Sequence, residues 1–272
     1  MSRLPDEILD DCLCRPDAPL AGDPARQYGL DKARAQERLA ELKEWLRERL
    51  TILRANRREA LLLILQGPDC SGKDGVIRRV LAGLDPRALA VHGFQPPSDA
   101  ERAHDFLWRY RQRLPAPGQL GVFDRSWYEG LISDPLDGLC GEDEVPARLE
   151  QVLAQEEHLP AQGIEPLKCY LQISRHEQKR RLHQRLEQID KRWKLAAGDL
   201  EAHRQFDLRQ ARWSTLLAVS HRPQAPWYVI PADHRWLRDL LLASLLAREL
   251  EKLDLDWPQR PPPFTADELE RA

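Results

Sequence analysis

The sequence predicts an α/β fold in which helices cover both faces of a mostly parallel, five-stranded sheet. Two observations lead to this prediction: short apolar runs bounded by turn residues, and helix-length stretches that separate those runs. Parallel strands need such crossover connections, whereas antiparallel strands are commonly joined by tight turns. The expected strands comprise residues 61–66, 88–92, 121–124, 167–173 and 227–230.

The first long helix is expected over residues 31–57, because leucines recur there at steps of three and four among charged residues. A second helix over residues 72–84 ends at the Asp85-Pro86 pair, since proline interrupts a helix. Further helices are expected over residues 99–113, 146–158, 175–186, 199–221 and 235–253. We expect residues 1–30 to form an arm and the residues after 257 to form a loose tail.

The composition excludes several classes of protein. The chain has 272 residues, of which 42% are hydrophobic, and a net charge of −3. We therefore expect a globular protein without the global positive field that attracts nucleic acid or an anionic membrane. No apolar run is long enough to cross a bilayer, and no secretory signal is recognisable, so we expect a cytoplasmic location. The five scattered cysteines suit a reducing compartment better than a disulfide framework.

A glycine-rich loop follows the first expected strand. Residues 67–74 read GPDCSGKD and fit the phosphate-binding pattern G-x-x-x-x-G-K between a strand and a helix. Its glycines let backbone N–H groups turn towards an anion, the helix adds its positive end, and Lys73 adds a mobile charge. The candidate phosphate-binding residues are Gly67, Cys70, Ser71, Gly72, Lys73 and Asp74. The alternative is a plain strand-to-helix turn with a surface lysine.

Two acidic residues in this loop indicate a metal. Asp74 stands where the usual pattern has a Ser or Thr that binds Mg²⁺, and Asp69 lies inside the loop. A carboxylate beside phosphates repels them unless a metal intervenes. We therefore expect at least one Mg²⁺, with Mn²⁺ as an alternative ion, held partly by Asp69. For Asp74 we expect a role in capping the helix or positioning Lys73.

The third expected strand ends in a second candidate motif, FDRSWYE over residues 123–129. Asp124 emerges from an apolar strand at the carboxyl edge of a parallel sheet, which is where such folds bind ligands and metals. Arg125 adds a planar cation suited to phosphate oxygens. We assign Asp124 to the metal together with Asp69. The alternative is a strand-end salt bridge between Asp124 and Arg125, with Trp127 and Tyr128 in the core.

Cations are concentrated between residues 175 and 222 of this otherwise slightly acidic chain. A solvated helix face is the ordinary explanation for such a run. A hinged basic lid is the alternative that we favour, since a lid closes over phosphates and excludes the water that would hydrolyse them. The cations are Arg175, Lys179, Arg180, Arg181, Arg185, Lys191, Arg192, Lys194, Arg204, Arg209, Arg212 and Arg222. We expect one domain over residues 1–272, with an N-terminal arm and helix over about 1–57 and the lid over about 175–222.

Six segments, in this order and spacing, closely resemble the polyphosphate kinase 2 family. They read GPDCSGKDGVIRRVLAGLDPR, VHGFQPPS, HDFLWR, FDRSWYE, RLEQIDKRWKL and APWYVIPADHRW. The resemblance covers about residues 35–258. It implies a three-layer α/β/α P-loop kinase fold with a helical lid, and transfer of a phosphoryl group between inorganic polyphosphate and a nucleotide with Mg²⁺. It also implies a homodimer or homotetramer.

The resemblance assigns roles to individual residues. It implies that Asp69 and Asp124 are metal-binding and catalytic carboxylates, and that Lys73 and Arg125 are catalytic phosphate ligands. It further implies contacts of polyphosphate or nucleotide with Arg109, Tyr128, Glu129, Arg185 and Lys194. Motif detail, especially HDFLWR and Glu129, is most similar to the branch that phosphorylates nucleoside monophosphates as well as diphosphates, so AMP and ADP are expected acceptors alongside guanine nucleotides.

The chain departs from the family pattern at four places. Gln95 stands where a Lys is common, Ile189 where a Pro is common, and His203 where an Arg is typical. The stretch SDPLDGLCGEDEV after residue 132 is also unlike the usual sequence. Two other functions stay open at this point: an ATP-dependent kinase of a nucleotide or small metabolite, and a nucleotide- or polyphosphate-binding regulator without turnover.

Overall fold

Five strands form one all-parallel sheet within residues 3–272, the part of the chain that the computed structural model describes. The strand order is β2-β3-β1-β4-β5. The strands are β1 (Ala60–Gln66), β2 (Leu89–Gly93), β3 (Leu120–Asp124), β4 (Ile164–Gln172) and β5 (Trp227–Pro231). The five expected strands and their parallel arrangement are confirmed.

Strand β1 lies at the centre of the sheet, between β3 and β4. Leu65 of β1 is in register with Asp124 of β3, so the glycine-rich loop and the FDRSWYE segment leave the sheet at the same edge. The chain crosses from β3 on one side of β1 to β4 on the other, and parallel α/β sheets bind ligands beside such a reversal. The topology therefore brings the two candidate motifs together.

Helices connect the strands and cover both faces. The α-helices are α1 (Asp6–Asp11), α2 (Lys32–Asn56), α3 (Lys73–Val80), α4 (Asp99–Arg102), α5 (Trp108–Arg111), α6 (Glu129–Leu136), α7 (Val145–His158), α8 (Arg175–Glu187), α9 (Ala197–Arg204), α10 (Phe206–Ser220), α11 (Arg235–Lys252) and α12 (Ala266–Glu270). Short 3₁₀ helices span Pro86–Ala88, Glu142–Glu144, Pro160–Gln162 and Ile189–Lys194.

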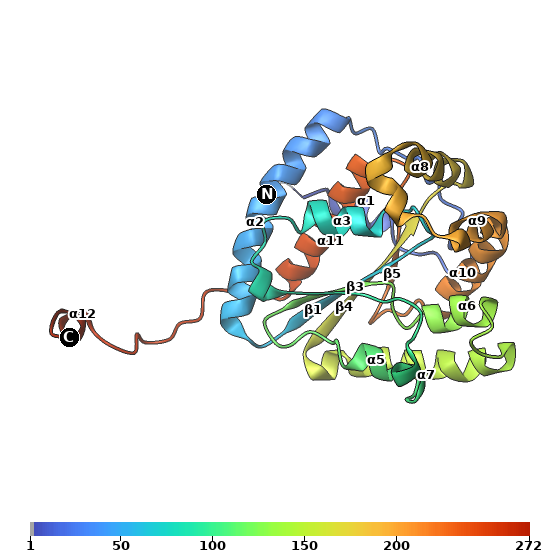
Figure 1. The fold of residues 1–272 in the computed structure, drawn as a ribbon. Coiled ribbons are helices and arrows are strands. Elements are labelled where there is room, and N and C mark those ends of the chain that lie inside the picture. Colours follow the sequence, from blue (N-terminus) through green and yellow to red (C-terminus); the bar gives the residue numbers. More distant parts are fainter. Residues whose placement is uncertain (1–2) are drawn as a thin grey trace.

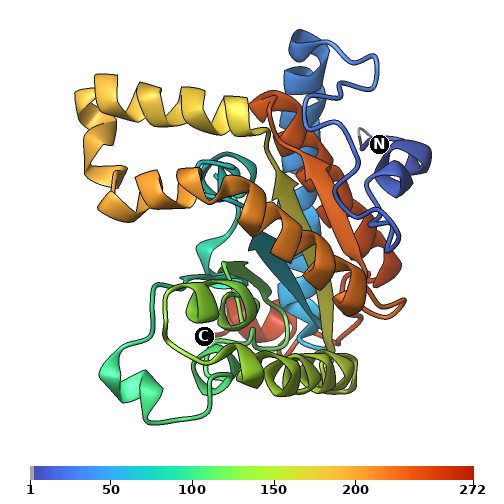
Figure 2. The ribbon, with the colours of Figure 1, turned by 90° about the vertical axis from the view of Figure 1, so that its right-hand side faces the viewer.

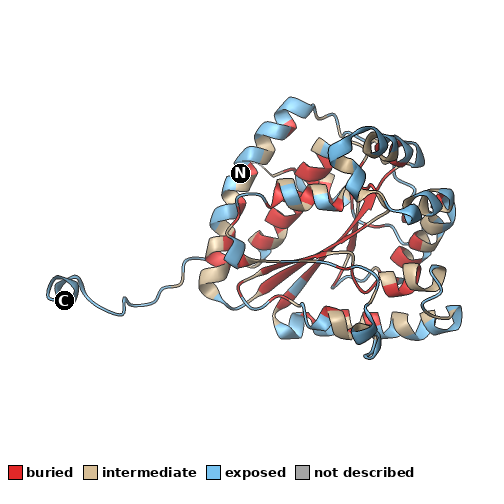
Figure 3. Cartoon of the chain, in the orientation of Figure 1, coloured by how far each residue is buried: buried red, intermediate tan, exposed pale blue. Residues whose placement is uncertain are grey.

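The sheet has a separate core on each face, which makes three layers (Figures 1 and 2). Leu61, Leu63 and Leu65 of β1 face α2, α3 and α11, whereas Leu62 and Ile64 face α7 and α10. Alternate side chains of a strand point to opposite faces, so a fully apolar run is buried on both. Figure 3 shows the central strand β1 buried along its whole length and the helices buried mainly on their inner sides, whereas the edge strand β2 is partly exposed. The three-layer prediction is confirmed.

The lid segment, residues 175–222, runs out along α8 and returns along α9 and α10. Figure 2 shows α8 (yellow) projecting beyond the carboxyl ends of the strands and α10 (orange) returning across the sheet, where Trp213 and Leu217 join the core. The prediction of one helix over residues 199–221 is wrong at one point, because the chain turns at Gln205. Phe206, the first residue after this turn, is buried.

The helix predicted over residues 99–113 is also wrong, since the structure has two single turns, α4 and α5. Between them the Asp105 side chain accepts the backbone N–H of Leu107 at 3.1 Å. A local side-chain hydrogen bond of this kind competes with the helical backbone and starts a new turn. The helical periodicity of the segment does not reveal this competition.

Three helices lie where none was predicted. Helix α1 lies in the expected arm and α12 in the expected loose tail, while α6 follows the FDRSWYE segment directly. Helix α6 contains both Gly130 and Pro135, which argue against a helix in sequence. A Cβ at Gly130 would lie 2.9 Å from the Phe106 ring, so the glycine allows α6 to pack against the segment before α5.

The N-terminal arm pairs with the outer edge of β5. The backbone N–H of Cys14 donates to Trp227 O at 2.8 Å, and that of Val229 donates to Cys12 O at 2.7 Å. At the other end of the chain, residues after α11 extend away from the body to α12 (Figure 1). Among residues 3–272, no helix combines the length and apolar character that crossing a membrane requires.

Candidate active site

The glycine-rich loop joins β1 to α3 in a tight turn. Cys70 and Gly72 both adopt left-handed backbone conformations, with φ of 67° and 103°. A Cβ at Gly72 would lie 2.0 Å from Arg238 Nη1, so only glycine fits this approach. Helix α3 begins at Lys73, and its first backbone N–H groups have no intrahelical acceptors. The loop therefore presents free donors at the carboxyl edge of the sheet, as predicted.

Two buried arginines hold the loop from behind. Arg181 of α8 donates to Cys70 O at 2.9 Å and Ser71 O at 3.0 Å, and Arg238 of α11 donates to Ser71 O at 2.8 Å. Arg238 is itself paired with Asp239 at 2.7 Å. Because these cations occupy the loop carbonyls, the N–H groups are left for an anion. The sequence pattern indicated Arg181 only as a lid cation and gave no sign of Arg238, whose partner lies 167 residues away.

Lys73 stays close to the loop in this structure. Its Nζ donates to Gly67 O at 2.7 Å and to Pro68 O at 3.3 Å. Gly67 is also sterically required, because a Cβ there would lie 2.7 Å from Leu171 O at a φ of 141°. The ammonium thus lies over the opening of the loop, at the place where a bridging phosphate oxygen would replace the carbonyls as its partner.

Asp69 and Arg125 form the link between the two motifs. Arg125 Nη2 donates to Asp69 Oδ1 at 2.7 Å. Arg125 has a left-handed backbone, with φ of 67°, which turns its side chain from the end of β3 towards the loop. Glu129 lies 3.6 Å away and, together with Asp69, raises the pKa of Arg125. Burial raises the pKa of Asp69, but Arg125 and Lys73 outweigh burial and lower it overall.

Asp124 lies beside another acidic residue, Asp74. Burial raises the pKa of Asp124, Lys73 opposes this rise, and Asp74 adds to it. Asp74 accepts a hydrogen bond from Lys194 of the lid at 2.8 Å, which lowers the pKa of Asp74. The predicted capping role of Asp74 is therefore replaced by a contact with the lid. This link was not visible in sequence because 120 residues separate the two partners.

The donor set fits a hard divalent cation that is completed by substrate oxygens. Among the residues described, no group of three or more His, Cys, Asp or Glu side chains could hold a metal by itself. Mg²⁺ is commonly bound by one or two carboxylates together with phosphate oxygens and water. The buried carboxyl of Asp124 beside Asp74 forms a like-charged pair, and a divalent cation there would relieve the repulsion. Asp69 lines the same cavity.

This cavity is large and positively charged. It has a volume of about 610 Å³ and lies between the loop, the end of β3 and the lid segment. In it Arg185 lies 3.7 Å from Asp199, and Lys194 contacts Asp74. Ten cations and five acids of the described chain line it, although the whole protein is slightly acidic. The cations are Lys73, Arg78, Arg79, Arg125, Arg181, Arg185, Lys191, Lys194, Arg235 and Arg238.

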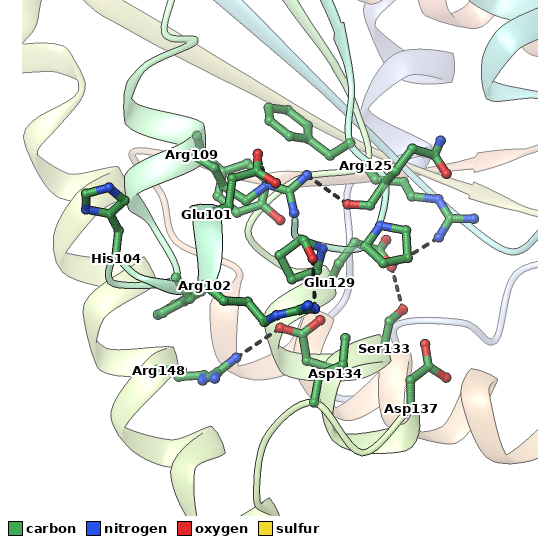
Figure 4. A pocket seen from close by; sticks show the side chains of 17 residues that line it. Glu101, Arg102, His104, Arg109, Arg125, Glu129, Ser133, Asp134, Asp137 and Arg148 are labelled. Carbon is green, nitrogen blue, oxygen red and sulfur yellow. Dashed lines mark hydrogen bonds and ion pairs between the residues drawn. The ribbon is translucent and has the colours of Figure 1, made fainter. Parts of the chain in front are cut away.

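A second, smaller cavity of about 230 Å³ adjoins the first. Figure 4 shows Arg125 and Arg109 on one side of it and Asp134 and Arg148 on the other. Arg109 donates to Gln95 O at 2.7 Å. The lining also includes phenyl, phenol and imidazole rings, two prolines and further charged side chains, among them Glu101, Arg102 and Glu129, a mixture of apolar and polar groups typical of small-molecule sites.

Two of the predicted residues support the site from behind instead of lining it. Tyr128 is fully buried, and its hydroxyl donates to Glu156 at 2.6 Å. Glu156 is held in turn by Lys168 at 2.7 Å. Ser71 is also fully buried, and its Oγ has no hydrogen-bond partner among the described residues. Tyr128 therefore anchors the segment after Arg125, whereas the Ser71 side chain is enclosed within the loop.

The positions that depart from the family pattern lie in different surroundings. Gln95 lines both cavities, whereas Ile189 is 81% exposed on the lid. His203 Nδ1 contacts Gln178 Oε1 at 2.7 Å, and Gln178 Nε2 donates to Asp69 O at 3.1 Å. The two contacts together connect α9 of the lid to the glycine-rich loop through one buried glutamine of α8.

Comparison with known proteins identifies the family. The sequence profile of "Polyphosphate kinase 2" matches residues 25–257. The chain is 37% identical to an AMP/ADP-polyphosphate phosphotransferase of Meiothermus ruber over 87% of this chain and 88% of that protein. It is 35% identical to an ADP-polyphosphate phosphotransferase of Rhodopseudomonas palustris, over 83% and 80%.

The fold leads to the same family. A crystal structure of polyphosphate kinase 2 from Arthrobacter aurescens TC1 superposes with a TM-score of 0.83 at 32% identity, covering 95% of this chain and 96% of that one. The P-loop kinase fold with a helical lid, implied by the sequence motifs, is confirmed. The profile match and these relatives together show that the chain belongs to the polyphosphate kinase 2 family.

Proposed function

We propose that the protein transfers a phosphoryl group between inorganic polyphosphate and a nucleoside mono- or diphosphate, converting AMP and ADP to ADP and ATP. The observation that carries this proposal is the junction of the two cavities. Phe94, Gln95 and Arg125 line both, so a ligand in one cavity can meet a ligand in the other at the Arg125 guanidinium. Relatives named as AMP/ADP- and GDP-polyphosphate phosphotransferases support it.

The larger cavity suits the polyphosphate chain. Its excess of cations offsets the charge of a linear polyanion, and its volume exceeds what a single phosphate needs. Lid residues Arg185 and Lys194 face the loop across the cavity. We assign polyphosphate to this cavity, with its reacting end at Lys73 and the first N–H groups of α3.

The smaller cavity suits the nucleotide. Its apolar walls accept a base and its Arg109 and Arg125 side accepts phosphates. Glu129 is an acceptor that repels phosphate but takes hydrogen bonds from ribose hydroxyls. We therefore place the acceptor phosphate beside Arg125, facing the reacting end of the polyphosphate.

Transfer requires alignment and charge neutralisation more than covalent chemistry, because the transition state is loose. Arg125, held by Asp69, takes up charge on the moving group, and Lys73 exchanges its loop carbonyls for the bridging oxygen. No general base is required, since the acceptor is already an ionised phosphate. Closure of the lid excludes water from the junction.

We assign Asp69 and Asp124 to the divalent metal, with Asp74 as the neighbour of Asp124. Mg²⁺, or Mn²⁺ in its place, neutralises charge on both phosphate chains when it is bound. The carboxylates contribute by fixing the ion near Lys73 and by orienting Arg125. A homodimer or homotetramer remains a prediction, which light scattering of the purified protein measures.

The test is a matrix of donors and acceptors. Polyphosphate or ATP is incubated with AMP, ADP, GMP or GDP and Mg²⁺, and the nucleotides are separated. We expect ADP and ATP from polyphosphate with AMP, and no product without metal. Products formed only when ATP is the phosphoryl donor, and not when polyphosphate is, would favour an ATP-dependent kinase. Nucleotide-induced stabilisation without product in any combination would indicate a binding protein and contradict the proposal.

A further inference from the structure

The far end of the smaller cavity is built by one segment whose sequence is unusual for the family. Residues 133–139 follow the first turn of α6 and contribute Ser133, Asp134, Asp137 and Leu139 to the lining. Figure 4 shows Asp134 and Asp137 opposite Arg109 and Arg125, the side to which the phosphates are assigned. If the phosphates lie beside Arg125, the base lies against this segment.

Asp134 is held in one orientation by Arg148. Arg148 Nη1 donates to Asp134 Oδ2 at 3.0 Å and to Gly130 O at 3.2 Å, and the guanidinium lies 5.0 Å from the centre of the Phe106 ring. Both ionic side chains are 16% exposed. No described residue donates a hydrogen bond to the other oxygen, Oδ1. One acceptor therefore faces the cavity, directly beside a fixed cation.

This arrangement matches one base edge. Adenine presents its amino group, a donor, next to ring nitrogens that accept. Guanine and hypoxanthine present the O6 acceptor at the same position, where a carboxylate oxygen repels it. Guanine also offers two adjacent donors, N1–H and the 2-amino group, but these need two free acceptor atoms, and Arg148 occupies one oxygen of Asp134.

We propose that Asp134, positioned by Arg148, accepts a hydrogen bond from the 6-amino group of adenine and makes this site selective for adenine nucleotides. The inference rests on the proposed function only in placing a nucleotide in this cavity. A site built to hydrogen-bond a substrate group discriminates strongly against analogues that lack the group. The chain thus carries a base-reading residue in α6, separate from the phosphate-binding machinery.

The experiment measures the dissociation constants of ADP, purine riboside 5′-diphosphate and IDP by calorimetry on the full-length protein. Purine riboside 5′-diphosphate lacks only the amino group, and IDP has a keto oxygen in its place. We expect ADP to bind about tenfold more tightly than the purine analogue, the loss of one charge-assisted hydrogen bond, with IDP weakest. This comparison needs no variant.

The substitution Asp134→Asn reverses the chemistry. Arg148 still requires an acceptor, so the amide oxygen turns to Arg148 and the amide N–H₂ faces the base. The variant should therefore bind IDP more tightly than ADP. Asp143→Asn is the matched control, because Asp143 is exposed outside the cavity, and it should keep the wild-type order.

Equal dissociation constants for the three nucleotides, or an unchanged order in Asp134→Asn, overturn the inference. A parallel assay of phosphoryl transfer from polyphosphate keeps the two proposals apart. Adenine-selective binding without transfer contradicts the proposed function and leaves the base-reading role intact. Transfer to all three nucleotides with equal affinity supports the function and refutes the role of Asp134. Failure of all three to bind contradicts both.

Discussion

Arg125 Nη2 and Asp69 Oδ1 lie 2.7 Å apart and join the end of β3 to the loop before α3. Each residue comes from a different motif. Arg125 reaches the junction of the two cavities from the end of β3, and Asp69 of the loop holds it there. The ion pair fixes the Arg125 guanidinium at the place where both cavities open, and it makes Asp69 a positioning residue for Arg125 as well as a candidate metal ligand.

We expect Asp69→Asn to lower kcat for polyphosphate-dependent transfer by about 10²-fold or more, since loss of one preorganised electrostatic contact costs about 2.7–4 kcal/mol in the transition state. Steady-state kinetics with saturating polyphosphate and AMP measure the change. Asp99→Asn is the control and should keep wild-type kcat. Asp99 is an exposed residue at the start of α4, in the segment that borders the nucleotide cavity. Near-normal turnover of Asp69→Asn would remove it from the catalytic group.

Gly72→Ala should prevent the loop from forming. The added Cβ meets Arg238 at 2.0 Å, and φ of 103° is strained for any residue with a side chain. We expect loss of at least about 2 kcal/mol of stability and of nucleotide phosphorylation, measured by urea denaturation and activity. Gly198→Ala is the matched control, because nothing lies within 4 Å of its Cβ, and it should be neutral or stabilise α9 by up to about 1 kcal/mol. Wild-type behaviour of Gly72→Ala would show that Arg238 moves freely.

The stability of the protein should fall on acidification through His221. Its Nδ1 accepts the backbone N–H of Trp227 at 3.3 Å, which requires the neutral ring, and burial followed by Lys168 lowers its pKa. Because the folded state binds the proton less readily than the unfolded chain, this contribution is fully present above the ordinary pKa of about 6.5 and declines as the pH falls below it.

Asn places an acceptor oxygen near the position of Nδ1 without a titratable group, so His221→Asn should flatten the difference in melting temperature between pH 7.5 and pH 5.5. A hydrogen bond of about 1 kcal/mol corresponds to a shift of about 2–4 °C in a domain of this size. Thermal denaturation at both pH values measures it. An identical pH dependence in the variant would show that other groups, such as His92 and His203, whose pKa values are also lowered, account for the whole effect.

Gln178→Ala should remove one of the links between the lid and the glycine-rich loop, the one that runs through His203, and leave those of Arg181 and Lys194 in place. Gln178 bridges His203 and Asp69 O, so its removal should lower kcat/KM for polyphosphate by about tenfold, as expected for loss of a buried hydrogen-bond bridge. The double variant with His203→Ala should be no worse than Gln178→Ala alone, because both changes break the same bridge. Additive losses in this double-mutant cycle would show that His203 and Gln178 act independently.

The parts of the fold that were predicted from sequence depend on local patterns. Strand β1 was located to within one residue because its apolar run is buried on both faces and ends at Gly67-Pro68. The break at Asp105 depends on a single side-chain hydrogen bond within an otherwise helical stretch, and the turn at Gln205 leaves no mark in the helical periodicity. Helix α6 contains residues that disfavour helices, and its tertiary packing, against Phe106 and through the buried Leu131 and Ile132, stabilises it.

In the candidate site, too, residues in local motifs were predicted, whereas residues that act through distant contacts were not. Lys73, Asp69, Asp124 and Arg125 were found because phosphate and metal chemistry requires those residue types at a strand end. Arg238 was missed, since a single arginine in a leucine-rich helix gives no sign that it faces Gly72. The ion pair of Asp134 with Arg148 was missed for a related reason, since Arg148 approaches from another helix.

The pairing of the N-terminal arm with β5 has a practical consequence. Residues 12–14 cover backbone groups of β5 that would otherwise be unpaired, yet the family profile begins only at residue 25. A protein trimmed to that boundary for expression would present an uncovered strand, which recruits strands of other molecules. We expect such shortened versions to precipitate or form aberrant assemblies, so the starting residue for recombinant production follows from strand coverage instead of from sequence similarity.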